Sequence, residues 1–486
     1  MIRTVTEAKR YDNRLTKRVI TVAPMPPEKS AYALARYSRS ADSIRQSVDW
    51  VRSHNSQQFL ESFYFQYGHQ SIADLGHTVL CFEGVSELAA TEIEDEVLWD
   101  GQARSSRYQN FSKSGFVTPP ELEGEHAELY KTSGDRLLKT YTAVHELVRD
   151  HLTSKLPRPD SMKPEVYGRN ITARAFDAAR YLLFWGVPTG VGQVTSIRTL
   201  EKQIKRLRVS EYAEVRELGD EVAAACAAPP ECVWNEGNAE PIAPTLARHA
   251  EPDEYLRQSR VDLTLWAAQN LNVPAVASVR VDLIKPNDVL TEIAATLLYP
   301  VSDHPFRAIY DTVQEWSRQR KAEVLDVAVK SRDIRDDLLR GFRGGQYCFD
   351  MLIDIGAYRD LHRHRRCHQY RQSYSGLHGY DTPSLITESS ADAIYREAMD
   401  AAIAAMQKLP NPARQYLLPF GARSRFLFKM DFAEVEYISR VRSAVKGHFS
   451  YRQIAWEMKQ RIEEIEPELA NLINATPPWI EDPLKR

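Results

Sequence analysis

The hexapeptide Tyr181-Leu182-Leu183-Phe184-Trp185-Gly186 returns later in the chain, with changes, as Tyr416-Leu417-Leu418-Pro419-Phe420-Gly421. An Ile-x-Arg-x-Arg pattern follows each copy, at residues 204–208 and again at 438–442. Two matches in the same order, at almost the same separation, favour a duplicated domain over coincidence. The period is far longer than a solenoid repeat, so each copy is large enough to bury a core of its own.

The sequence between the two copies changes character. Residues 227–254 are rich in proline, alanine and acidic side chains and lack sustained apolar periodicity. We therefore predict a first domain over residues 1–226, a linker over 227–270 and a second domain over 271–486. The length of 486 residues, 43% of them hydrophobic, is sufficient for more than one core.

Hydrophobic periodicity predicts a mixed α/β protein. Apolar residues recur at helical spacing in four segments, 128–152, 211–227, 305–330 and 450–469. The short apolar runs at 77–82 and 346–353 are better candidates for strands. Both element types occur on each side of the predicted linker.

Composition excludes several classes of protein. The net charge is -3 and no long run of lysine or arginine is present, so we expect no nucleic acid partner. No apolar segment approaches the length of a membrane span, and the N-terminus lacks the apolar core of a signal peptide. The five cysteines are odd in number and scattered, which fits a reducing compartment. We predict a cytoplasmic protein that does not bind membranes.

The densest cluster of chemically active side chains lies in Leu361–Ser373, where imidazole and guanidinium groups occupy the consecutive positions His362–Arg365. Guanidinium groups bind phosphate oxygens in bidentate geometry, and planar arginine or histidine can lie against an aromatic ring system. A phosphorylated ligand that carries a ring suits both properties.

Two other interpretations of this cluster stay open on the residues alone. It could be a solvated basic helix face, although the preceding Ile353–Leu361 is largely apolar. It could also hold zinc through His364, Cys367 and His368, but the interleaved arginines would repel a cation. We therefore predict no metal site.

The first half contains a weaker candidate site. Ser105 and Arg107, close to Gly101, could hold a phosphate through hydroxyl, guanidinium and backbone N–H donors. An ordinary polar turn would look the same, so the pattern is not specific by itself.

Taken together, these motifs resemble those of the flavin-dependent thymidylate synthases. Arg363-His364-Arg365, then seven residues, then Ser373 is similar to the family signature. The first half resembles the family through Gly68-His69-x-Ser71, Phe82–Ser86 and Ser105-x-Arg107-Tyr108, but Asp95, Glu96 and Val97 stand at its signature positions. Ala179-Arg180 and the later Arg442 also match, and the whole looks like a long, duplicated form of the family.

The resemblance implies an α/β fold of two tandem domains, each a β-sheet packed with helices, and active sites shared between copies. The second half keeps Arg363, His364, Arg365 and Arg442 but has Ser375 and Gln415 where the family has arginines. The first half does the reverse and keeps Ser105, Arg107 and Arg180. The resemblance therefore predicts composite sites that join the two halves. It also predicts a homodimer whose four domains form a pseudo-tetramer.

The implied reaction is the reductive methylation of dUMP to dTMP with FAD as cofactor and NADPH and methylenetetrahydrofolate as co-substrates. Arg363 would be the catalytic residue near the uracil. The residues implied for substrate binding are Ser105, Arg107, Arg180, Arg442 and Ser373. Those implied for flavin binding are His69, Ser71, Arg363, His364, Arg365 and His448.

Two departures from the family pattern fall at the pyrimidine end of the implied pocket. The family commonly has an acidic residue two positions before the serine, whereas Ala103 and Arg371 stand there, and Asp360 replaces a usual glutamine. The alternatives are a flavoenzyme that modifies another uridine nucleotide, and a non-catalytic nucleotide-binding scaffold left by duplication.

Overall fold

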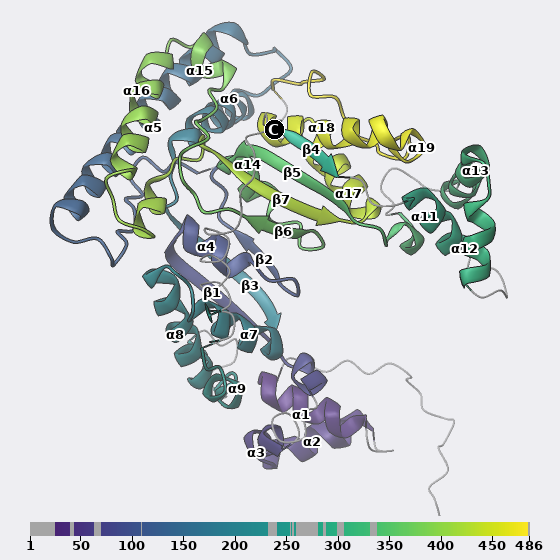
Figure 1. The fold of residues 1–486 in the computed structure, drawn as a ribbon. Helices are drawn as coiled ribbons and strands as arrows, with labels where there is room; N and C mark the ends of the chain where they lie inside the picture. Colours follow the sequence, from purple (N-terminus) through teal and green to yellow (C-terminus); the bar gives the residue numbers. More distant parts are fainter. Residues whose placement is uncertain are drawn as a thin grey trace, which may run out of the picture. The chain divides into compact units, whose positions relative to one another are not determined.

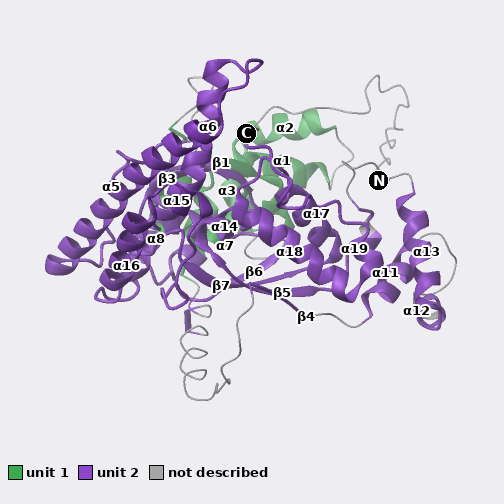
Figure 2. Ribbon diagram, turned by 90° about the horizontal axis from the view of Figure 1, so that it is seen from above, with its two compact units in different colours: residues 1–79, 194–205, 219–252 green, residues 80–193, 206–218, 253–486 purple. Residues whose placement is uncertain are grey.

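The computed structural model describes residues 25–38, 43–62, 70–107, 109–231, 241–252, 254, 257–258, 280–284, 288–298, 306–330 and 338–484. The chain forms two compact units (Figure 2). Unit 1 comprises residues 1–79, 194–205 and 219–252, and unit 2 comprises residues 80–193, 206–218 and 253–486. Unit 2 contains segments from both predicted domains. The boundaries at 226 and 271 stay predictions.

Unit 1 is built from short helices. Ser43 and Gln46 form a capping box that starts α2. The buried carboxylate of Glu28 accepts hydrogen bonds from the backbone N–H and the hydroxyl of Thr245, which ties α1 to α9. The elements that lie entirely within unit 1 are α1 (Pro27–Tyr37), α2 (Ile44–Ser53), α3 (Ser56–Leu60), η2 (Gln70–Leu75) and α9 (Pro244–Arg248).

Two sheets, most of whose residues belong to unit 2, form the framework of the fold (Figure 1). The first has the order β1-β3-β2, with β1 (His77–Ser86), β2 (Asp100–Ala103) and β3 (Pro188–Ser196). The second has the order β4-β5-β7-β6 and antiparallel pairing throughout. Its strands are β4 (Val281–Ile284), β5 (Tyr347–Asp354), β6 (His368–Arg371) and β7 (Arg423–Met430).

Each sheet belongs to one of two copies of the same set of elements. This repeat confirms the tandem α/β fold that the sequence predicts. β1, α4 (Glu87–Glu94) and β2 correspond to β5, α14 (Ile355–Leu361) and β6, and β6 begins 268 residues after β2. The serine cap of α4, Ser86, has its counterpart 268 residues later in Asp354, the cap of α14. Likewise β3 and α7 (Ile197–Leu207) correspond to β7 and α17 (Phe432–Arg442) at a spacing of 235 residues.

Helices cover the sheets. The long α5 (Gly124–Lys155) packs against α6 (Pro164–Ala179) and α16 (Asp392–Met406), while α18 (Phe449–Ile465) packs on α17 and β4 (Figure 1). Among the described helices, none combines the length and the apolar character that a membrane crossing needs. The remaining elements are η3 (Arg180–Leu182), α8 (Ala213–Ala227), α11 (Val289–Leu298), α12 (Phe306–Gln314), α13 (Arg318–Val329), η5 (Arg340–Phe342), α15 (Ser384–Glu388), η6 (Ala413–Leu417) and α19 (Pro467–Ala470).

The repeated hexapeptides meet each other in the core of unit 2, and we call this contact the seam. Phe184 and Pro419 face each other across an antiparallel bridge. The Trp185 N–H donates to the Leu418 carbonyl at 3.3 Å, and the corresponding Phe420 N–H donates to the Leu183 carbonyl at 2.7 Å. Gly186 with Tyr416 and Gly421 with Tyr181 form a second such pair, at 2.8 and 2.9 Å. The reciprocity of these bonds places a local two-fold axis at the seam.

The seam also fixes the two helices that begin beside it. The first N–H groups of a helix have no partner within the helix. At α4, the N–H groups of Glu87 and Leu88 donate to the carbonyls of Val187 and Trp185. At α14, the N–H groups of Ile355 and Gly356 donate to Ala422 and Phe420 in the same way. Both helices therefore start from the backbone of the seam.

Most of the elements predicted from periodicity are observed. The predicted strand 77–82 lies within β1, and the predicted strand 346–353 matches β5 apart from its first residue. The helical patterns at 128–152 and 211–227 coincide with α5 and α8. The pattern at 305–330 forms two helices, α12 and α13, because the side chain of Ser317 caps α13 and starts a new helix. The pattern at 450–469 is similarly divided before Pro467, the first residue of α19.

The seam leaves no room for a side chain at either glycine. A Cβ on Gly186 would lie 2.0 Å from the Tyr130 hydroxyl oxygen, and one on Gly421 would lie 2.7 Å from that of Tyr395. We expect Gly186→Ala and Gly421→Ala each to lower the free energy of unfolding by about 1–3 kcal/mol through overpacking, as measured by urea denaturation. Gly168→Ala is the control, because nothing lies within 4 Å of that Cβ in α6; it should raise stability by about 0.5–1 kcal/mol. Equal midpoints for all three variants would contradict this account of the seam.

Candidate active site

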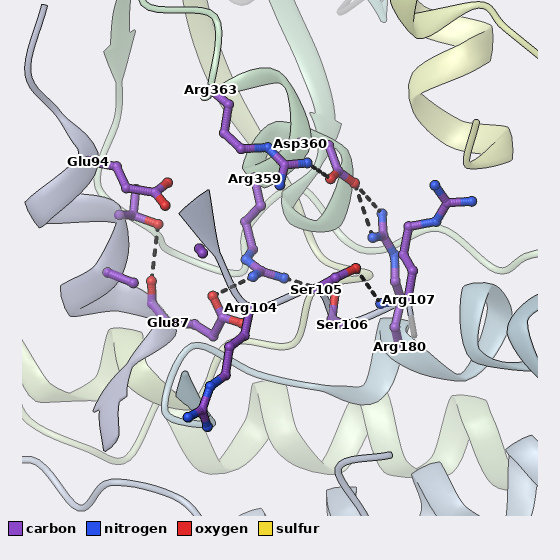
Figure 3. A pocket seen from close by; sticks show the side chains of 13 residues that line it. Glu87, Glu94, Arg104, Ser105, Ser106, Arg107, Arg180, Arg359, Asp360 and Arg363 are labelled. Atoms are coloured by element: carbon purple, nitrogen blue, oxygen red, sulfur yellow. Dashed lines mark hydrogen bonds and ion pairs between the residues drawn. The ribbon is translucent and has the colours of Figure 1, made fainter. Parts of the chain in front are cut away.

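An enclosed cavity in unit 2 is lined by both halves of the chain (Figure 3), and we call it the arginine pocket. Its volume of about 20 Å³ has room for little more than one water molecule, so a larger ligand requires side chains to rotate away. The lining residues are Glu87, Ala90, Thr91, Glu94, Ala103, Arg104, Ser105, Ser106, Arg107, Arg180, Arg359, Asp360 and Arg363.

Arg107 is held rigidly by its own neighbours. Its Nε and Nη2 donate to the two carboxylate oxygens of Asp177 at 2.7 and 3.2 Å, and its Nη1 donates to the Tyr451 hydroxyl at 2.9 Å. Burial opposes the charge, but Asp177 outweighs it and raises the pKa of Arg107. The side chain is therefore a fixed cation at the end of the loop that follows β2.

Asp360 joins two further arginines across the pocket. Both terminal nitrogens of the fully buried Arg180 donate to its Oδ2 at 3.1 Å, and the Arg363 guanidinium forms an ion pair with its Oδ1. Burial alone would raise the pKa of Asp360, but Arg180 and Arg363 lower it well below its usual range. Asp360 thus occupies the position where the two guanidinium groups could bind an anionic ligand.

Arg359 closes the centre of the pocket. Its guanidinium pairs with the buried carboxylate of Glu87, donates to the Ser106 hydroxyl at 3.2 Å and lies 4.5 Å from the centre of the Phe420 ring. Since Glu87 is on α4 and Arg359 on α14, this pair connects the two halves next to the seam.

Glu94 differs from the other carboxylates of the pocket. It is only 8% exposed, and its Oε1 has no hydrogen-bond partner. Burial raises the pKa of Glu94 to about 7, with Arg363 opposing the shift and Glu87 adding to it. A buried carboxyl oxygen without a hydrogen bond is costly to maintain, so its presence in the pocket calls for a reason.

The histidine of the basic cluster is engaged by its surroundings. Nε2 of His364 accepts a hydrogen bond from Nε of Arg442 at 2.7 Å, which leaves its Nδ1 facing Glu434 at 3.5 Å. Burial lowers the pKa of His364, and the Glu434 carboxylate opposes this shift. The Arg442 guanidinium also lies 5.6 Å from the ring of Tyr451, which on its hydroxyl side binds Arg107.

Arg365 points to a different surface of the same turn. It pairs with the exposed Asp100 at 2.6 Å and lies 5.4 Å from the centre of the Trp99 ring. Among the described residues, no group of three or more His, Cys, Asp and Glu side chains is arranged to hold a metal ion. His364 is already occupied by Arg442 and Glu434.

A second cavity, the tyrosine pocket, corresponds to the first through the repeat. Its volume is about 310 Å³, and Asp95, Ser373 and Gln415 stand in it where Arg363, Ser105 and Arg180 stand in the arginine pocket. The Gln415 side-chain oxygen accepts hydrogen bonds from the Tyr212 hydroxyl and the Tyr374 N–H. The lining comprises Asp95, Glu211, Tyr212, Tyr358, Gln369, Tyr370, Arg371, Gln372, Ser373, Tyr374 and Gln415.

The chain matches the family described as thymidylate synthase complementing protein over two segments, residues 19–228 and 281–468. These segments include more than half of the chain, with one in each half.

The chain belongs to this family.

The family is that of the flavin-dependent thymidylate synthases, and two matched segments are consistent with the two-copy form that the sequence predicts. The chain is also similar to curated proteins that share a long alignment with it. It is 26% identical to a UPF0159 protein of Chlamydia muridarum and 27% identical to one of Chlamydia pneumoniae, each over 82% of this chain and 77% of the relative. It is 23% identical to the UPF0159 protein Ta1429 of Thermoplasma acidophilum, over 90% of this chain and 93% of the relative.

Several site residues implied by the family resemblance lie together. Ser105, Arg107 and Arg180 from the first half line the arginine pocket with Arg363 from the second half. The pocket is thus assembled within one chain. Arg442 lies behind it, in contact with His364 and Tyr451.

The structure places the other predicted residues elsewhere. Ser373 lines the tyrosine pocket and is separate from Ser105. His448 is completely buried, caps α18 through Nδ1 and donates through Nε2 to the Asp177 carbonyl at 2.9 Å. Ser71 lies in η2 of unit 1, whereas His69 lies outside the described residues. The flavin roles of these residues stay predictions.

Sequence reasoning missed the acidic side of the pocket. Glu87 and Glu94 are seven residues apart, two turns of helix, and Thr91 lies between them on the same face. That spacing was available as a signal. Asp177 pairs with Arg107, and Arg359 pairs with Glu87. No sequence pattern indicates either pair, because the partners are distant in sequence.

The raised pKa of Glu94 gives a measurable pH dependence. Below pH 4.5 the carboxyl is neutral in both the folded and the unfolded chain, and the free energy of unfolding is highest with respect to this group. That contribution is lost as the pH rises through about 7, where the folded chain must also ionise the carboxyl. We expect Glu94→Gln to be more stable than the wild type at pH 8 by roughly 3 kcal/mol at most, and nearly equal at pH 4.5. Urea denaturation over this range measures the difference. Glu83→Gln, at an exposed position on β1, serves as the control and should be the same as wild type at every pH.

Proposed function

We propose that the chain is a flavin-dependent thymidylate synthase that converts dUMP to dTMP in the arginine pocket. Methylenetetrahydrofolate would supply the carbon and NADPH the reducing equivalents. The observation that carries this proposal is the meeting of Ser105, Arg107 and Arg180 with Arg363 in one cavity. Each half keeps the motif residues that the other half has lost. Random decay into a scaffold would not produce such a complementary pattern.

The phosphate of the nucleotide would bind to the loop after β2 and to η3. The Ser105 hydroxyl can donate a hydrogen bond, and Arg107 and Arg180 supply fixed positive charge. Charge-assisted hydrogen bonds of this kind contribute roughly 1.5–3 kcal/mol each. Because Asp177 and the carbonyl of Gly356 hold these two cations from behind, both can stay in place while Asp360 and Arg363 move apart to admit an anion.

Arg363 would act at the ring of the nucleotide. Its side chain is 31% exposed, more than that of any other arginine in the pocket for which an ion pair is described, so it can leave Asp360 when a ligand enters. A guanidinium beside the uracil would stabilise negative charge on the ring, and this electron density is what carbon 5 uses when it attacks an electrophile.

The residues around Arg363 also suit a flavin. Arg363 and Arg365 provide planar cations for phosphate oxygens and for a ring system. These residues, with His364, would hold FAD, and His69, Ser71 and His448 are proposed to assist. When bound, FAD supplies the carrier for the carbon or the hydride, which the protein's side chains cannot provide. Two chains would pair as a homodimer.

Flavin binding is the direct test of the proposal. We expect the purified chain to take up roughly one FAD, and its visible spectrum to shift when dUMP is added. Absence of bound flavin at saturating FAD would overturn the enzyme and favour a nucleotide-binding scaffold. A spectrum that responds to UMP but not to dUMP would instead favour modification of another uridine nucleotide.

Two arginine variants test where the site is assembled. We expect Arg363→Ala and Arg107→Ala each to lower turnover by roughly 100-fold or more, because each removes a cation from the same pocket. Arg366→Ala is the matched control, since that side chain pairs with Asp431 outside the pocket and should retain wild-type activity.

Mixing the two inactive variants under conditions of subunit exchange should restore no activity. Each chain would then carry one damaged pocket, and neither could be repaired by its partner. Recovery of activity would show that the site forms between chains. Thermal melting of each variant identifies a loss of activity caused by misfolding.

A further inference from the structure

The carboxyl of Glu94 is a polar group in the arginine pocket that has no partner on one of its oxygens. It lies at the last residue of α4, is 8% exposed and lines the cavity. Its Oε1 is buried without a hydrogen bond among the described residues. Buried polar atoms are rarely left unsatisfied, so a donor from outside the chain is expected here.

The charges around Glu94 do not supply that donor. Arg359 from α14 and Arg363 and Arg365 from the turn after it face this carboxyl, but they form ion pairs with Glu87, Asp360 and Asp100 respectively. Glu87, on the same helix, adds a like charge, and burial raises the pKa of Glu94 to about 7. The neutral acid is therefore well populated at neutral pH. It presents an O–H donor and a C=O acceptor side by side.

Charge also divides the pocket into two ends. Figure 3 shows Glu94 on one side of the cavity and Arg107 and Arg180 on the opposite side, with Arg359 and Ser105 between them. A phosphate is attracted to the end with Arg107 and Arg180. The uncharged part of the same ligand would then extend toward Glu94.

We infer that Glu94, as a neutral acid, recognises the imide edge of the ligand's ring, where a ring N–H lies next to a C=O. The ring N–H donates to the carboxyl C=O, and the carboxyl O–H donates to the ring C=O. This inference rests on the proposed function and specifies which side chain recognises the base of the nucleotide. Uracil carries such an edge and so does the flavin ring. The division of charge favours uracil.

Binding of dUMP at saturating FAD, followed by calorimetry and by the flavin spectrum, tests the inference without relying on turnover. We expect Glu94→Leu to weaken dUMP binding by roughly 10- to 100-fold, because the imide is left unpaired in a closed pocket. Glu94→Gln should stay within roughly threefold of wild type at pH 7, since an amide offers the same donor and acceptor. Glu83→Gln is the control and should bind like wild type.

Two further comparisons identify the edge. A ligand methylated at ring nitrogen 3, 3-methyl-dUMP, should bind wild type and Glu94→Leu equally. As pH rises from 6 to 9, the affinity of wild type relative to Glu94→Gln should fall, by up to roughly tenfold per pH unit above the pKa. The ratio cancels the titration of the ligand's own phosphate.

The outcomes separate this inference from the proposed function. Failure of the wild type to bind either dUMP or FAD would overturn the proposed function. If wild type binds both and Glu94→Leu binds both equally well, the recognition role alone is overturned. A loss confined to FAD binding in Glu94→Leu would support recognition of an imide edge and assign that edge to the flavin.

Discussion

The reciprocal backbone pairing between Leu183–Gly186 and Tyr416–Gly421 is the interaction on which the rest of unit 2 depends. It joins the two copies by main-chain hydrogen bonds in the buried core and supplies the carbonyls that start α4 and α14. The two helices in turn carry part of the lining of the arginine pocket, including Glu87, Glu94, Arg359 and Asp360. A shift of the seam would therefore displace both helices together. This explains how residues as distant in sequence as Glu87 and Arg359, 272 positions apart, can form one ordered site.

Most of the charged side chains of the pocket are neutralised by ion pairs within the protein. These cations and carboxylates pair with each other, through Arg107 with Asp177, Arg180 and Arg363 with Asp360, and Arg359 with Glu87. Pairs of this kind cost desolvation energy that their attraction only partly returns. What they provide is a set of guanidinium groups held in place before a ligand arrives. Arg363 and Asp360 are the pair that an anion would divide.

Much of this organisation was predictable from the sequence, and the reasons are local. The duplication was visible because the hexapeptides at 181–186 and 416–421 are continuous in sequence, and the strands and long helices followed from periodicity. The motif residues Ser105, Arg107, Arg180 and Arg363 could be grouped because their spacing resembles a known family. The partners Asp177 and Arg359 could not, because ion pairs between distant positions leave no pattern along the chain. The separation of Ser373 from Ser105 was missed for a related reason, since only the assembled repeat shows that each serine belongs to its own cavity.

The local two-fold axis of the seam passes between two different residues, Phe184 and Pro419. In an assembly of identical chains, a residue on a two-fold axis meets its own copy, and any change there is made twice. A fused pair is free of that constraint, because an aromatic ring and an imino acid can occupy the two sides of the axis. The same freedom extends outward from the axis. Each of the two cavities can then change its charge alone, so that one accumulates arginines while the other fills with tyrosines. Covalent linkage thus turns a symmetric scaffold into one on which two different surfaces can diverge under separate selection.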